Sequence, residues 1–96
     1  MNKAIEEHEK VPLLLSKDQI DLIIKHTFAE DDLLDALQVA EVVGRRVKVL
    51  FTLHDLEDLN GHVAAVANHC EDRKLQNQFD AIYDAIQKVE LKYDLR

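Results

Sequence analysis

The clearest pattern in the chain is a stripe of apolar residues spaced alternately four and three apart in the C-terminal third. The stripe comprises Leu75, Phe79, Ile82, Ile86, Val89 and Tyr93. This is the spacing of the apolar seam of a helix that packs lengthwise against another helix. It predicts a helix over about 72–92, packed against this chain or a second copy. These six residues are therefore the candidate interface residues.

A second long helix is predicted over 53–69, with Thr52 as its N-cap. Apolar residues fall on one arc at 100° per residue; they are Leu56, Leu59, Val63, Val66, Ala67 and Cys70. The phase of this arc continues through Asn60-Gly61, so the pair is interpreted as helix and not as a turn. Glycine in a helix costs about 1 kcal/mol relative to alanine. We therefore expect another backbone to approach closely at Gly61.

Two further helices are predicted in the first half of the chain. Ser16 and Gln19 have the spacing of a capping box, and apolar residues then recur at helical spacing to about His26. A second helix is expected over about 30–43. It begins with acidic residues, which are favourable at a helix N-terminus, and Gly44 is placed to end it.

Residues 46–51 alternate between apolar and other side chains and are rich in β-branched residues, which predicts a strand. The only other apolar extended segment is 11–15, where Pro12 restricts a strand to a sheet edge. We therefore expect 11–15 to pair with 46–51, within the chain or across a dimer. The alternative is a hairpin of 39–43 with 46–50 around Gly44-Arg45.

The predicted fold is mainly α, with about four helices around one core and a minimal two-stranded β element, 11–15 with 46–51. A length of 96 residues leaves room for one domain, assigned to 11–96. Residues 1–10 are predominantly polar and are expected to form a frayed or helical arm.

The charge balance limits the partners of this chain. It has 12 basic against 19 acidic residues, a net charge of −7, and this argues against nucleic acid as the default partner. It has no apolar run long enough for a membrane span, and its N-terminus is too polar for a signal peptide. A single cysteine excludes an internal disulfide framework. We expect a cytoplasmic protein with no cofactor.

The strongest candidate for chemistry is a polar face of the helix predicted over 53–69. Its candidate metal ligands are His54, Asp58, His62 and His69. Imidazole and carboxylate suit zinc, and His54 and Asp58 lie one turn apart. However, His54 and His62 are separated by about 12 Å along the helix axis, so one ion cannot bind both. The commoner meaning of this spacing is a solvated polar face, and we assign no metal site.

Two other features have little specificity. His54-Asp55 is a dipeptide that also occurs in metal-dependent phosphohydrolases, but the other ligand-bearing helices of such enzymes do not fit this length. Cys70 follows His69, yet it falls on the apolar arc of the helix, which favours a buried structural thiol.

The sequence thus predicts a small acidic, non-enzymatic protein-interaction or regulatory module that self-associates as a homodimer through its helical seams. The alternative is a small metal-binding protein or metal-dependent hydrolase that uses the His/Asp face. A third hypothesis is a regulator of nucleic-acid transactions that acts through protein contact or acidic mimicry.

Overall fold

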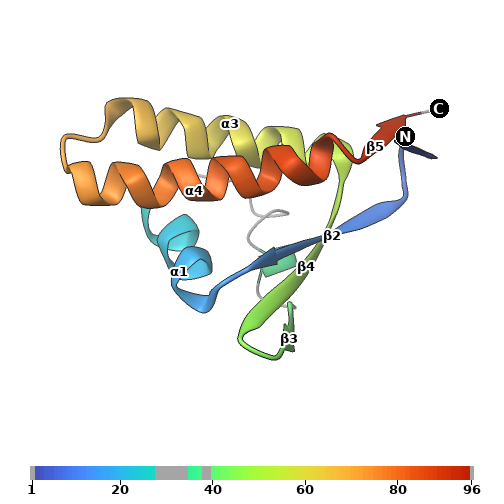
Figure 1. Ribbon diagram of the computed structural model, residues 1–96, viewed down its shortest axis with the longest axis horizontal. Helices are drawn as coiled ribbons and strands as arrows, with labels where there is room; N and C mark the ends of the chain where they lie inside the picture. Colours follow the sequence, from blue (N-terminus) through green and yellow to red (C-terminus); the bar gives the residue numbers. More distant parts are fainter. Residues whose placement is uncertain (1, 28–34, 38–39, 96) are drawn as a thin grey trace.

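The computed structural model describes residues 2–27, 35–37 and 40–95 of the chain. The elements in chain order are β1 (Lys3–Ile5), β2 (Lys10–Leu15), α1 (Lys17–His26), β3 (Glu41–Val43), β4 (Arg46–Thr52), α3 (Leu53–His69), α4 (Arg73–Glu90) and β5 (Tyr93–Leu95). Residues 35–37 are also helical. Figure 1 shows α3 and α4 as an antiparallel pair along the long axis, with α1, β2, β3 and β4 beneath them and β1 and β5 beyond one end of the pair.

The larger sheet has the strand order β2-β4-β3. β2 runs antiparallel to β4, with Leu13 opposite Val49. The predicted pairing of 11–15 with 46–51 is therefore confirmed, and it forms within one chain. β2 is an edge strand, as Pro12 indicated.

The two faces of this sheet differ because side chains alternate along each strand. Every second residue of β2 and β4 is buried; these are Val11, Leu13, Leu15, Val47, Val49 and Phe51. The opposite face carries Leu14 and Leu50, which are 43% and 47% exposed. The buried face forms one layer of the core.

The second layer of the core is the helix pair. α3 contributes Leu56, Leu59 and Val63, and α4 contributes Phe79, Ile82 and Ile86, all at 0% exposure. Both helices were predicted with nearly correct bounds, because the apolar phase and the caps are local signals. Thr52 Oγ1 accepts a hydrogen bond from the Asp55 amide at 3.1 Å, and the capping box of Ser16 and Gln19 is complete at the start of α1.

The predicted helix over 30–43 is wrong at its C-terminal end. Residues 28–34 and 38–39, including the acidic start of that helix, lie outside the described residues. Residues Glu41–Val43 form β3, which pairs with β4 around Gly44-Arg45. The hairpin alternative is therefore the observed structure here. Gly44 has φ +63° and is the only described residue with a positive φ. A two-residue hairpin turn whose first residue is glycine requires this conformation.

The fold class predicted from the sequence is also wrong, because the protein is a mixed α/β fold with two sheets. The second sheet pairs β1 with β5 in parallel. It places the two ends of the chain side by side (Figure 1). Residues 3–5 are thus a strand and not a frayed or helical segment, and Ile5 is only 2% exposed.

The structure also corrects the explanation for Gly61. Apart from its chain neighbours and the adjacent helix backbone, a Cβ built at Gly61, or at Gly44, has no atom of the described residues within 4 Å, so no other described backbone approaches Gly61 closely. Among the described residues, none of the helices combines the length and apolar character that crossing a bilayer requires.

The two glycines should respond to alanine with opposite signs. Gly61→Ala should stabilise the fold by up to about 1 kcal/mol, because it sits in a helix with free space around it. Gly44→Ala should cost about 1–2 kcal/mol, because its backbone must hold a positive φ. Urea denaturation of both variants measures the change in the free energy of unfolding. Changes of the same sign in the two variants would contradict the assigned backbone conformations.

Candidate binding groove

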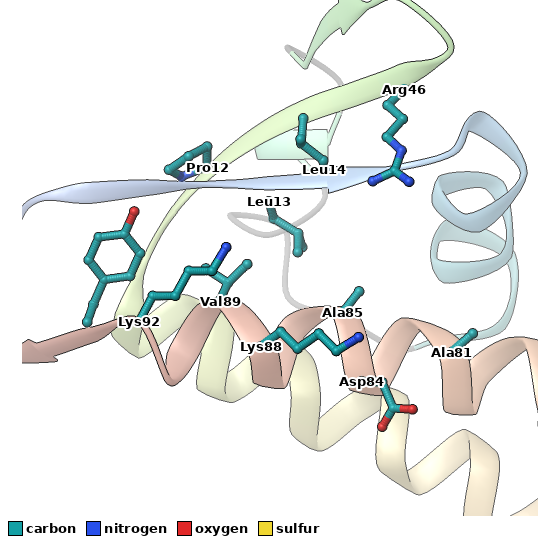
Figure 2. A pocket seen from close by; sticks show the side chains of 11 residues that line it. Pro12, Leu13, Leu14, Arg46, Ala81, Asp84, Ala85, Lys88, Val89 and Lys92 are labelled. Atoms are coloured by element: carbon teal, nitrogen blue, oxygen red, sulfur yellow. The ribbon is translucent and has the colours of Figure 1, made fainter. Parts of the chain in front are cut away.

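A groove of about 520 Å³ separates the edge strand β2 from the helix α4 (Figure 2). Its lining residues are Pro12, Leu13, Leu14, Arg46, Ala81, Asp84, Ala85, Lys88, Val89, Lys92 and Tyr93. Its volume lies within the range of ordinary ligand pockets. Two secondary-structure elements form opposite walls of this groove.

The first wall is β2, whose sequence Lys10–Leu15 alternates between exposed and buried residues. Leu13 points from this strand toward α4 (Figure 2). Within the described residues, β2 pairs only with β4, so its other edge has no strand beside it. Such an edge offers backbone N–H and C=O groups to an added strand, except that Pro12 has no N–H to donate.

The second wall is a face of α4 adjacent to its buried seam. Ala81, Ala85 and Lys88 recur at four and three residues, so they lie along one side of the helix, and Lys92 follows in the turn after α4. The buried seam of α4 carries large side chains such as Phe79 and Ile82, whereas this adjacent face carries Ala81 and Ala85. The small alanine side chains leave space between the helix and the strand. The groove is therefore a consequence of small side chains on this one face.

The rim of the groove is basic although the chain is acidic. Arg46, Lys88 and Lys92 line it with one carboxylate, Asp84. In the described part of the chain, none of the three cations forms an ion pair; the two ion pairs found are Lys48–Glu41 and His54–Asp58. Three unpaired cations thus border an apolar floor of Leu13, Ala85 and Val89.

The groove continues toward α1. A second hollow of about 450 Å³ shares Leu14, Arg46, Ala81 and Ala85 with the first. It extends the lining to Gln78 on α4 and to Ser16, Asp18, Gln19 and Leu22 around the start of α1. The two hollows together form one channel along β2, here called the β2–α4 groove.

The six candidate interface residues separate into two groups. Phe79, Ile82 and Ile86 are fully buried in the core of this chain, so they present no surface to a partner. Leu75, Val89 and Tyr93 are half-buried. Val89 and Tyr93 line the β2–α4 groove.

The structure brings together only part of the candidate metal face. His54 Nε2 lies 3.8 Å from Asp58 Oδ2, and both side chains are exposed. His62 is half-buried and His69 exposed, one and three further turns along α3 respectively. No cluster of three or more His, Cys, Asp or Glu side chains with metal-binding geometry occurs among the described residues.

Cys70 is half-buried at the end of α3, and not buried as expected. Its Sγ donates a hydrogen bond to the Asp72 carbonyl oxygen at 3.2 Å. This contact fixes the thiol in the short connection between α3 and α4.

A polar contact joins α3 to the C-terminal end of α4. The Asn60 side-chain amide donates to Glu90 Oε1 at 3.4 Å, while Asn60 Oδ1 is buried and has no hydrogen-bond partner among the described residues. Burial raises the pKa of Glu90 above its ordinary value of 4.5, and the carboxylate of Glu57 raises it further, against a lowering by the Asn60 hydrogen bond. Glu90 therefore destabilises the fold when it is ionised.

This gives a pH dependence of stability with a definite sign. The pKa of Glu90 is higher in the folded than in the unfolded chain. The contribution of protonated Glu90 to folding stability is therefore fully present below pH 4.5 and is lost as pH rises through the folded pKa. Glu90→Gln should remove that loss, so the variant should gain in melting temperature over the native chain between pH 4.5 and 7. Glu71→Gln, at an exposed side chain, is the control. A Glu90→Gln variant with an unchanged pH profile would contradict this assignment.

Comparison of the chain with protein-family models, with curated proteins and with solved structures found no significant match. The function is therefore inferred from the geometry of the chain itself.

The β2–α4 groove is not evident from the sequence, because the apolar seam of α4 is the stronger pattern in this part of the chain. A signal was present on the neighbouring face, where Ala81 and Ala85 are followed one turn later by Lys88 and Val89. The other signal was Pro12, which marked 11–15 as a sheet edge. Neither indicates a groove until the strand and the helix are placed against each other.

Proposed function

We propose that this chain is a small non-enzymatic protein-interaction module and that the β2–α4 groove is its binding site. The observation that carries the proposal is the unpaired edge of β2 beside an apolar floor and three unpaired cations. An open strand edge next to a helix can accept an extended segment of another protein, with backbone hydrogen bonds for affinity and side-chain pockets for specificity.

A cytoplasmic location and self-association belong to the same proposal. The outer face of the larger sheet carries exposed apolar side chains that could contact a second copy. They include Leu14, Val43 and Leu50, which are between 43% and 48% exposed. Light scattering on a sizing column decides this part, because a dimer has twice the chain mass of 11.0 kDa.

Selection from a displayed library of random eight-residue peptides tests the binding function. Sequences enriched on the native chain should be lost on Ala85→Phe, because the phenyl ring fills the floor shared by both hollows. Gln87→Phe adds the same ring to an exposed position of the same helix outside the groove and should keep them. Circular dichroism confirms that both variants fold. No enrichment, or enrichment equal on all three proteins, would overturn the proposal.

A further inference from the structure

We infer that the occupant of the β2–α4 groove is an extended acidic segment of a partner protein, which adds as a strand to the free edge of β2. This inference rests on the proposed function and specifies the partner. The shape of the groove, its charge and the open edge of β2 point to this occupant.

The first argument is the length of the groove walls. β2 has six residues, which at about 3.3 Å per residue span about 20 Å. The lining residues of α4 run from Gln78 to Val89, and eleven steps of about 1.5 Å give about 17 Å. Two walls of similar length match an extended segment of about five or six residues better than a compact small molecule.

The second argument is charge complementarity. The chain as a whole carries a net charge of −7, so it repels acidic segments over most of its surface. Arg46, Lys88 and Lys92 outnumber the carboxylates that line the groove, Asp84 and Asp18, and no carboxylate of the described residues pairs with these three cations. The unpaired cations favour a partner with carboxylates spaced along its chain.

The third argument is the alternation that a strand imposes on its side chains. In an added strand, successive side chains point to opposite faces. One set meets the floor formed by Leu13, Ala85 and Val89, where apolar side chains are favourable (Figure 2). The partner segment is therefore expected to alternate apolar and acidic residues.

Single-stranded nucleic acid is the competing occupant, because its phosphates would also meet the three cations. It uses neither the apolar floor nor the backbone edge of β2. The net negative charge of the chain also opposes a long polyanion. The two occupants differ in a measurable way, since only a peptide strand depends on its own backbone N–H groups.

Fluorescence polarisation with labelled, end-capped octapeptides tests the inference. The probe alternates Glu and Val, and a peptide that alternates Lys and Val is its charge control. Two further probes carry N-methyl groups, one on every Glu and the other on every Val. A strand hydrogen-bonds to one neighbour through alternate residues, so one N-methylated probe should lose binding about tenfold or more and the other should retain it.

Charge variants of the protein complete the test. Lys88→Glu with Lys92→Glu should weaken binding of the Glu/Val probe about tenfold, and added salt should weaken binding to the native chain. Lys25→Glu with Lys74→Glu makes the same charge change at exposed residues outside the groove and should change affinity less than about twofold.

The outcomes separate this inference from the proposed function. Equal binding of both N-methylated probes, stronger binding of the Lys/Val peptide, or tighter lysine-dependent binding of an eight-residue thymidine oligonucleotide overturns the acidic strand. If the peptide library still yields sequences that Ala85→Phe abolishes, the interaction function stands with another occupant. If the library yields no enriched sequences, both the proposed function and the acidic-strand inference fail.

Discussion

Phe79→Ala should destabilise the protein by about 3–5 kcal/mol, one of the two largest effects of a single substitution expected here. Phe79 is 0% exposed and lies in the core between the helix pair and the sheet. Its ring also packs against the imidazole of His26 on α1 in a T-shaped arrangement with a centroid separation of 5.9 Å. Removal of the ring leaves a cavity that α1, α3 and α4 cannot close without moving.

Urea denaturation at two protein concentrations checks this prediction. Asn77→Ala, two residues away on the exposed side of α4, is the matched control and should cost less than about 0.5 kcal/mol. A cost of Phe79→Ala below about 1 kcal/mol, or a cost that changes with protein concentration, would contradict an intrachain role for this residue. Such a result would instead place Phe79 in the interface that the spacing of the apolar seam predicted.

The helices α1, α3 and α4 could be predicted because their signals are local. The apolar phase of α3 and α4, the N-cap at Thr52 and the capping box at Ser16 each involve residues within one or two turns. Hydrogen bonds and packing reinforce the same assignment, so tertiary contacts did not override it. The antiparallel pair β2 and β4 was predictable for a further reason, since few other segments could satisfy its backbone groups.

β3 was missed as the first choice because its sequence continues the period of the preceding helical residues. Val42 and Val43 are compatible with a helix or a strand, and pairing with β4 decides between them. The turn at Gly44-Arg45 makes this pairing possible, but the same glycine also suits a helix end. A local pattern cannot distinguish these two uses of Gly44.

β1 and β5 were missed because each has three residues and they pair across nearly the full length of the chain. Their alignment places Lys3 beside Tyr93 and Ile5 beside Leu95. No periodicity can be recognised in three residues, and Tyr93 was instead assigned to the seam of the last helix. The β2–α4 groove depends on the same kind of long-range placement, because one wall comes from the start of the chain and the other from its end.

Ile5→Ala should destabilise the protein by about 2–4 kcal/mol, although its neighbours in the sequence are polar. Ile5 is 2% exposed and packs into the same core as Phe79. The parallel ladder with β5 anchors it there, and the Lys3 amide donates to the Lys92 carbonyl oxygen at 2.9 Å.

The matched control is Lys3→Ala, which removes an exposed side chain and keeps the backbone ladder; it should cost less than about 0.5 kcal/mol. Native-state hydrogen exchange gives a second measurement, because the Lys3 amide should be protected if β1 is paired with β5. An Ile5→Ala cost below about 0.5 kcal/mol together with fast exchange at Lys3 would mean that residues 1–10 are the frayed arm that their polarity suggested. The predicted cost with slow exchange would mean that one buried side chain and its backbone ladder tie the N-terminus to the end of α4, beside the wall of the binding groove.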